Sequence, residues 1–180
     1  MEETAYTNQM KIVITGPESS GKSTLFNALE KHYNLNGVAE YARDFLSTTN
    51  GKYHMGDLLT IAKGQLNAEL IKLEAADKFL LCDTDLLTIK IWSEYKFKSC
   101  ADEIVNLLKA YPANLYILMS PDIPWEPDSL RENPSDRDQL LQIYEQELIQ
   151  LQIPYFLVSG DIASRLSRAI KIINNFLSLN

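Results

Sequence analysis

Nine consecutive residues near the start of the chain have the types and the spacing of a phosphate-binding loop. Residues 16–24 read GPESSGKST, in which Gly16 and Gly21 bracket four residues and are followed by Lys22 and Ser23. Glycine at these positions allows backbone angles and close approaches that a Cβ would block. Successive N–H groups can then surround phosphate oxygens. Lys22 would neutralise the β- and γ-phosphates, and the Ser23 hydroxyl would bind Mg²⁺. The motif therefore predicts a site for ATP and Mg²⁺.

The sequence on either side of the loop has the strand and helix patterns that this motif requires. An apolar, β-branched run, MKIVIT, precedes it, and LFNALEKHY follows it with apolar residues at helical spacing. The main-chain amides of the loop carry the expected binding, so the sequence assigns no role to the side chains between the two glycines. The residues expected to bind the nucleotide are Gly16, Glu18, Ser19, Ser20, Gly21, Lys22, Ser23 and Thr24.

The rest of the chain alternates short apolar runs with amphipathic helical patterns. We expect helices over residues 22–33, from 41 onward, and over 55–76, 86–95, 101–110, 139–151 and 162–177. The expected strands are residues 10–15, 37–40, 79–82, 115–119 and 155–158. This order predicts an α/β fold of the P-loop NTPase type, with a parallel five-stranded sheet flanked by helices. Ligands of such sheets bind at the carboxyl ends of the strands, which directs attention to the polar residues that follow each strand.

Two carboxylates follow the strand at 79–82. Asp83 stands where a P-loop NTPase holds Mg²⁺, directly or through water. Asp85 would face the acceptor of the phosphoryl group and accept its hydroxyl proton. Asp-Thr-Asp before an apolar helix is also good capping chemistry, so helix capping stays an alternative for either residue.

The stretch EYARDF, which follows the expected strand at 37–40, would also face the acceptor. Glu40 could bind hydroxyls or act as a base, Arg43 could pair with a carboxylate or phosphate, and Tyr41 could stack on a flat ring. Asp44 belongs to the same candidate substrate set. The alternative is an exposed helix start with ordinary charges.

A proline-rich, charged stretch at about 121–138 separates two well-patterned elements and reads as a lid loop. Closing it would bring Arg131 and Arg137 onto the transferring phosphate and exclude water. A solvated charged loop is the alternative. Trp92, on the helix expected at 86–95, is a candidate for the acceptor pocket, with core packing as the alternative.

Composition bounds the remaining possibilities. The chain has 180 residues, 46% of them hydrophobic, and a net charge of −7. We expect a flexible tail at 1–9 and one domain over 10–180. No basic patch points to nucleic acid, and no apolar run has the length of a membrane span. Cys82 and Cys100 lack metal-ligand spacing, and no targeting segment is evident, so we expect reduced thiols and a cytoplasmic location. The oligomeric state is not predicted.

Several strings occur together in one order: GPESSGKST, EYARDF, GDLLTIAKGQ, CDTDLLTIKIW and DIPWEPDSLR. With them, the chain from about residue 10 resembles the ribosylnicotinamide kinase domain of NadR-type NAD-salvage proteins. The resemblance implies ATP-dependent phosphorylation of the 5′-hydroxyl of nicotinamide riboside, which gives nicotinamide mononucleotide. It implies a metal or acceptor role for Asp83 or Asp85 and makes Arg131 and Arg137 the lid arginines. The riboside-pocket candidates that it implies are Glu40, Tyr41 and Trp92.

Two departures from that family matter. NadR-type proteins carry an N-terminal adenylyltransferase domain, whereas few residues precede the first strand expected here, so we expect the kinase step alone. The family's lid motif, Asp-Gly-x-Arg, reads Asp128-Ser129-Leu130-Arg131, and the missing glycine would change the turn. Two alternatives stay open: a kinase for another nucleoside or a mononucleotide, and an ATP-binding regulatory module with slow ATPase activity.

Overall fold

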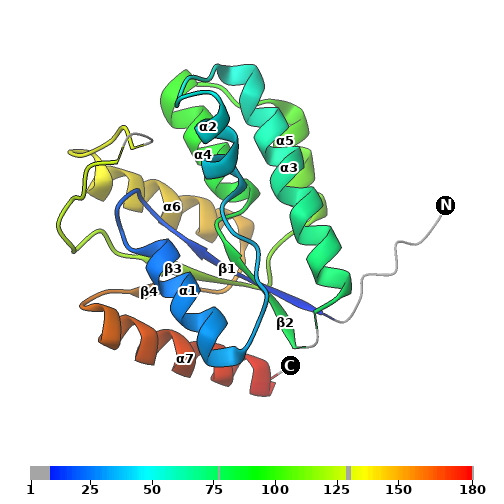
Figure 1. Ribbon diagram of the computed structural model, residues 1–180, viewed down its shortest axis with the longest axis vertical. Coiled ribbons are helices and arrows are strands. Elements are labelled where there is room, and N and C mark those ends of the chain that lie inside the picture. Colours follow the sequence, from blue (N-terminus) through cyan, green and yellow to red (C-terminus); the bar gives the residue numbers. More distant parts are fainter. Residues whose placement is uncertain (1–8, 77, 129–130, 180) are drawn as a thin grey trace.

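A computed structural model describes residues 9–76, 78–128 and 131–179 (Figure 1). The expected tail, apart from Gln9, lies outside these residues, as do Ser129 and Leu130 of the lid motif. The strands are β1 (Met10–Thr15), β2 (Phe79–Asp83), β3 (Leu115–Met119) and β4 (Tyr155–Val158). The helices are α1 (Lys22–Tyr33), α2 (Tyr41–Thr48), α3 (Met55–Glu74), α4 (Leu86–Phe97), α5 (Asp102–Ala110), α6 (Arg137–Leu151) and α7 (Ile162–Leu179).

The strands form one parallel sheet in the order β2-β1-β3-β4. In the register of this sheet Ile14 on β1 lies beside Asp83 on β2, and Thr15 lies beside Leu118 on β3. All strands therefore end at the same edge, and the loops that follow them meet there. This arrangement confirms the α/β fold and the parallel sheet expected from the sequence.

The sheet has four strands among the described residues, so the prediction of five was wrong. The segment expected as a strand at 37–40 makes a single bridge, between Val38 and Cys82. The Val38 N–H donates to the Leu81 carbonyl, and its own carbonyl accepts from the Asp83 N–H, both at 2.8 Å. Pairing stops there because Glu40 is already the residue before α2. The segment is thus too short to continue the ladder.

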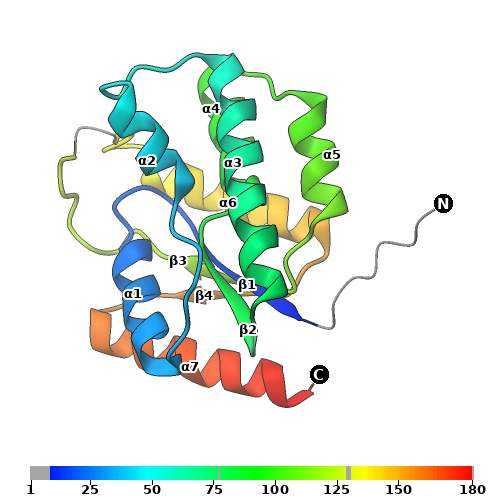
Figure 2. The ribbon, with the colours of Figure 1, turned by 45° about the vertical axis from the view of Figure 1, so that its right-hand side comes forward.

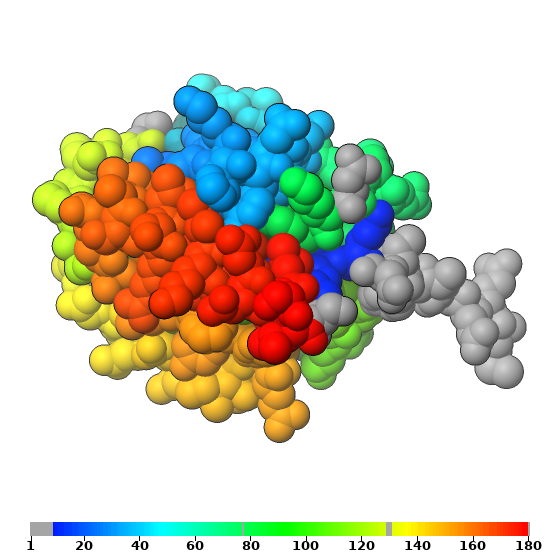
Figure 3. Space-filling view, turned by 90° about the horizontal axis from the view of Figure 1, so that it is seen from below, coloured from blue at the N-terminus to red at the C-terminus, as the bar shows by residue number. Residues whose placement is uncertain are grey.

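Alternation along the strands sends side chains into two apolar layers. On one face Val13, Leu80 and Tyr116 pack with residues of α3, α4, α5 and α6. On the other face Ile12 and Ile117 pack with residues of α1 and α7. Figure 2 shows α3 in front of the sheet with α2 and α5 beside it, and Figure 3 shows α1 and α7 forming the surface of the opposite side. None of the helices in the described ranges combines the length and the apolarity needed to cross a membrane.

Candidate active site

The loop between β1 and α1 adopts a conformation that its glycines make possible. Gly16 has φ +132°, and a Cβ on it would lie 2.8 Å from the Met119 carbonyl oxygen. Gly21 has φ +82° and is the N-cap of α1. Because it has no side chain to cap the helix, the first N–H groups of α1 are left for another acceptor. A helix N-terminus of this kind favours an anion such as phosphate.

Two side chains of the loop bond back onto it. The Ser20 hydroxyl donates to the Pro17 carbonyl oxygen at 2.7 Å, and Lys22 Nζ donates to the same oxygen at 2.8 Å. The Lys22 ammonium therefore lies against the backbone of the loop. Both residues line the pocket described below.

Asp83, the last residue of β2, and Ser23 on α1 form an oxygen pair beside the loop. The Ser23 side chain interacts with the Asp83 carboxylate, whose Oδ1 is buried and has no hydrogen-bond partner among the described residues. Burial raises the pKa of Asp83, while Ser23, Lys22 and Arg43 oppose the shift. A buried carboxylate oxygen without a partner calls for a ligand, and hard oxygen donors suit Mg²⁺. These residues fit the cation.

Asp85 lies apart from this pair and does not line the pocket. Its side chain is fully buried, accepts from the Leu87 N–H at 3.1 Å to cap α4, and accepts from the Tyr116 hydroxyl at 2.7 Å. Lys11 Nζ is 3.7 Å away and makes an ion pair with Glu69 at 2.9 Å. Although burial disfavours the ammonium, Glu69 and Asp85 raise the pKa of Lys11. The structure therefore gives Asp85 the capping position rather than a place facing an acceptor.

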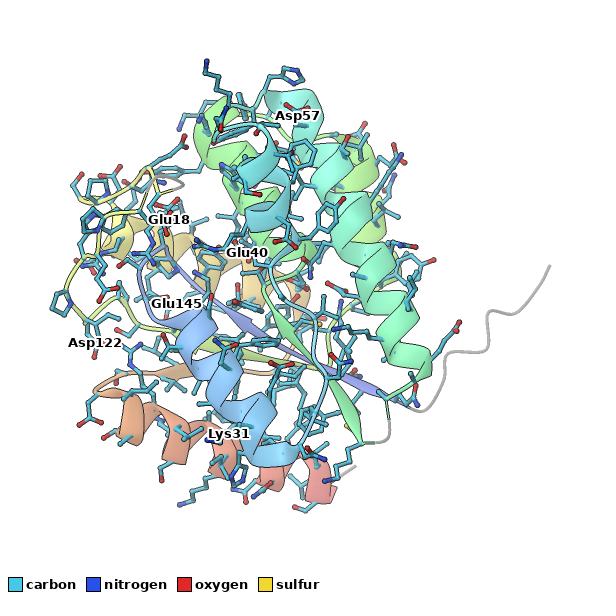
Figure 4. All side chains as sticks on the ribbon, viewed as in Figure 1. Glu18, Lys31, Glu40, Asp57, Asp122 and Glu145 are labelled. Carbon is cyan, nitrogen blue, oxygen red and sulfur yellow. The ribbon has the colours of Figure 1, made fainter. Side chains whose placement is uncertain are left out.

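One pocket connects the P-loop with the helices that cover the sheet. Glu40 enters it from the start of α2, and Figure 4 shows it on the same side of the molecule as Glu18 of the loop. The Glu40 side chain is 25% exposed, and burial raises its pKa against the charges of Lys22 and Arg43. Besides the loop, the residues that line the pocket are Glu40, Ala42, Arg43, Leu46, Thr88, Ile91, Trp92, Tyr95, Arg131, Asn133, Leu140 and Tyr144.

The candidates from α2 and α4 divide between the pocket and other positions. Trp92 lines the pocket and donates its Nε1–H to the Tyr53 hydroxyl at 2.8 Å. Tyr41 instead lies against α3, where a Cβ on Gly64 would come within 2.2 Å of its ring. Asp44 is exposed and is not a lining residue. The structure thus brings Glu40, Arg43 and Trp92 together and leaves Tyr41 and Asp44 outside.

The loop between β3 and α6, the segment predicted to be a lid, contacts the P-loop through several hydrogen bonds. Arg131 lines the pocket and donates from Nη1 to the Ser19 hydroxyl oxygen at 3.2 Å. Arg137, now the first residue of α6, donates to the Ser19 carbonyl at 3.2 Å and to the Ile123 carbonyl at 3.0 Å. Its guanidinium also lies 5.7 Å from the centroid of the Trp125 ring. Arg131 therefore faces the pocket, whereas Arg137 holds the backbone of the P-loop.

Glu18 ties this lid to the P-loop, a role that the sequence did not assign. Its Oε2 accepts from the N–H groups of Glu132 and Asn133 at 2.9 and 3.0 Å. The Glu132 carboxylate in turn binds Lys96 at 2.7 Å and accepts from the Tyr53 hydroxyl at 2.8 Å. An acidic side chain is unexpected in a loop that is predicted to bind an anion. Its presence at Glu18 could have indicated that the side chain turns away from the phosphate and binds another segment.

The lid also contacts α2. Arg43 Nη1 lies 3.0 Å from the Asp128 carboxylate. Figures 1 and 2 both show the loop passing beside α2. The lid is thus held from the P-loop on one side and from α2 and α4 on the other.

Arg165 on α7 is a second residue that the sequence did not single out. Its side chain is buried beneath the P-loop and forms an ion pair with Asp122. The signal was present, since Arg165, Ala169 and Ile173 recur every four residues and all are buried. An arginine on the buried stripe of a helix needs hydrogen-bond acceptors around it.

Comparison with known proteins identifies a matching family model and a related protein. A family model described as an AAA domain matches residues 11–165. The trifunctional NAD biosynthesis/regulator protein NadR of Escherichia coli (strain K12) is 29% identical over 174 residues, which cover 92% of this chain and 42% of the relative. The chain therefore spans less than half the length of that relative.

Two solved structures share the fold. NadR protein in complex with NR superposes with a TM-score of 0.68 at 16% identity, over 96% of this chain and 52% of that chain. Deoxyadenosine kinase from M. mycoides superposes with a TM-score of 0.64 at 16% identity, over 92% of this chain and all of the other. At these identities the likeness establishes the fold. Since the family model spans most of the sequence and includes the P-loop, the chain belongs to the AAA-domain family of P-loop proteins.

Proposed function

We propose that the protein is an ATP-dependent kinase that phosphorylates the 5′-hydroxyl of nicotinamide riboside to give nicotinamide mononucleotide. The observation that carries the proposal is a single pocket with the P-loop on one wall and Glu40, Trp92 and Tyr95 on another. The names of the relatives support it, because they include a NAD biosynthesis/regulator protein, a NadR protein in complex with NR and a deoxyadenosine kinase. The proposal treats residues 10–180 as one kinase domain.

The reaction is a transfer of the γ-phosphoryl group of ATP to the acceptor hydroxyl. The hydroxyl oxygen forms a bond to the γ-phosphorus, the bond between that phosphorus and the β–γ bridging oxygen breaks, and ADP leaves. The main-chain amides of the P-loop hold the β-phosphate, while Lys22 and Arg131 neutralise charge on the oxygens around it. Ser23 and Asp83 would hold Mg²⁺, which when bound supplies positive charge to the phosphates.

Glu40 is the carboxylate that we assign to the acceptor hydroxyl. It lines the pocket, whereas Asp85 is buried in the capping position of α4. Burial raises the pKa of Glu40 above its ordinary value, which makes the carboxylate a better proton acceptor. The proton released when the hydroxyl is phosphorylated would pass to Glu40.

The pocket chemistry favours a nucleoside over a mononucleotide as acceptor. The cation nearest Glu40 on α2 is Arg43, and it lies 3.0 Å from Asp128 and 3.9 Å from Glu40. A phosphate on the acceptor would have to displace these carboxylates and would meet the charge of Glu40. The aromatic rings of Trp92 and Tyr95 suit a flat base.

The test is ADP release by the purified chain with ATP, Mg²⁺ and a panel of acceptors: nicotinamide riboside, the common nucleosides and deoxynucleosides, and their monophosphates. We expect nicotinamide riboside to give the highest kcat/KM. Lys22→Ala should abolish turnover, and Lys31→Ala, at the far end of α1 in Figure 4, should not. No stimulation by nicotinamide riboside would remove that acceptor, and a better nucleoside would replace it.

A regulatory module with slow ATPase activity is the rival from a different class. It predicts an acceptor side that is shallow and poor in aromatic residues, whereas Trp92, Tyr95 and Tyr144 line this pocket. The same assay separates the two functions, because a regulatory ATPase would release ADP at the same rate with and without every acceptor.

A further inference from the structure

One buried arginine joins the loops that follow neighbouring strands of the sheet. Arg165, 2% exposed, donates to carbonyl oxygens of the P-loop, of the loop after β3 and of the loop after β4. The acceptors are the carbonyls of Ser20, Ser120 and Gly160 and the carboxylate of Asp122. Asp122 also accepts from the Gly160 N–H at 2.7 Å. Four of the five guanidinium N–H donors therefore connect the carboxyl ends of β1, β3 and β4.

The bond to the P-loop has a directional consequence. In a planar trans peptide the carbonyl oxygen and the N–H point in opposite directions. The Ser20 carbonyl points to Arg165, so the N–H of Gly21 in the same peptide points away from Arg165. Gly21 lines the pocket and Arg165 does not, so the side away from Arg165 is the pocket side. The Gly21 amide is thereby aimed at the place where a phosphate would lie.

The peptide before it is held in the same way from another direction. Arg137 donates to the Ser19 carbonyl at 3.2 Å, which turns the N–H of Ser20 away from Arg137. Successive amides turned to one side form the concave anion site of a P-loop. One guanidinium comes from the end of the lid and the other from α7.

We propose that Arg165 is a positioning residue for phosphate binding: it fixes the Ser20–Gly21 peptide so that the Gly21 amide faces the phosphate. The inference rests on the proposed function because both involve the same nucleotide site. It makes a claim about phosphate binding and none about the acceptor. Arg165 touches no substrate in this scheme and acts through the backbone that it holds.

The experiment measures pyrophosphate binding by calorimetry with the full chain. Arg165→Gln should weaken pyrophosphate about 10- to 100-fold, the range for losing one hydrogen bond to a charged group. Arg165→Lys should weaken it as well, because an ammonium keeps the charge but lacks the planar fork that reaches several loops. Arg168→Gln removes an exposed charge from the same helix and should leave the affinity unchanged.

A second readout separates positioning from a general effect on stability. In the wild type, pyrophosphate should shift the Gly21 amide resonance in an ¹⁵N–¹H NMR spectrum, and in Arg165→Lys this shift should be lost or much reduced. A purely structural arginine would lower Tm and leave both the shift and the affinity intact. If Arg165→Gln does not fold, Arg165→Lys carries the test.

Wild-type affinity in Arg165→Gln, or full recovery in Arg165→Lys, would overturn the inference, since recovery would mean that charge alone matters. The outcome is separable from the proposed function. A wild-type chain that binds pyrophosphate and phosphorylates no nucleoside would refute the kinase proposal, while the comparison of the Arg165 variants would still decide the positioning role.

Discussion

The contact between Glu18 and the lid makes a quantitative prediction. The Glu18 carboxylate accepts two main-chain N–H groups, from Glu132 and Asn133, at 2.9 and 3.0 Å. Hydrogen bonds to a charged group contribute about 1.5–3 kcal/mol each, and we take about 1 kcal/mol for each of these because one is exposed and the other is only partly buried. Glu18→Ala should then cost the closed lid about 2 kcal/mol, which is about a 30-fold shift toward the open form.

Amide hydrogen exchange measures this shift directly. Exchange at Glu132 and Asn133 should speed up by about 30-fold in Glu18→Ala, and tryptic cleavage after Arg131 should accelerate with it. Glu126→Ala removes an exposed glutamate from the same loop and serves as the control. Exchange and cleavage at the wild-type rates in Glu18→Ala would show that the lid is held elsewhere and would refute the reasoning.

Three further perturbations test the site. Burial raises the pKa of Glu40, so kcat/KM should fall on the acid side of the pH profile at a pH above the range of an ordinary glutamate. Glu40→Gln should remove this fall. If the fall persists in the variant, another group accepts the proton. Asp83→Asn should raise the Mg²⁺ concentration for half-maximal activity at least about tenfold in a metal titration. Without metal at neutral pH the same variant should raise Tm, because burial raises the pKa of Asp83 and so makes the ionised carboxylate costly in the folded state. A lower Tm would contradict this sign. Gly64→Ala places a Cβ 2.2 Å from the Tyr41 ring and should lower the free energy of unfolding in urea by about 1–3 kcal/mol. Gly56→Ala, whose new Cβ would be 3.6 Å from its nearest neighbour, should not lower it. Equal stability of the two variants would mean that α2 moves to accommodate the Cβ without cost.

Features with a strong local signal were predictable from the sequence. The bounds of α1, β3 and β4 agree with the expected ones because continuous apolar runs and a regular helical period define them without tertiary context. The segment around Val38 was wrongly predicted to be a strand because its structure does depend on tertiary context. Whether a short apolar stretch becomes a strand depends on how many partners the neighbouring strand offers, and here it offers one bridge.

The two aspartates after β2 illustrate what the motif could not decide. Thr84 between them has φ 65°, so the chain turns there and sends Asp83 toward Ser23 and Asp85 toward Tyr116. A left-handed threonine has no sequence signature strong enough to anticipate. From the sequence, either carboxylate could have served a ligand or capped the helix, and the turn at Thr84 is what directs them to different places.

The side-chain roles of Glu18 and Ser19 were also out of reach, because their partners lie more than a hundred residues away in the lid. For Arg165 the sequence shows a place on the apolar face of a helix, but not its acceptors, which belong to three separate loops. A local motif identifies the amides that we expect to bind phosphate, whereas the groups that hold those amides in place come from distant segments.

The buried charges around Lys11 specify how the strands align as the sheet forms. Lys11 on β1, Asp85 after β2 and Tyr116 on β3 meet in the interior. Sliding β1 by one residue would turn the lysine to the other face of the sheet and leave its ammonium unpaired in an apolar layer, at a cost of several kcal/mol. The same alignment sets Asp83 beside Ile14, two residues before the P-loop begins. The register that brings Lys11 to its partners is therefore also the register that sets the position of Asp83 relative to the phosphate loop.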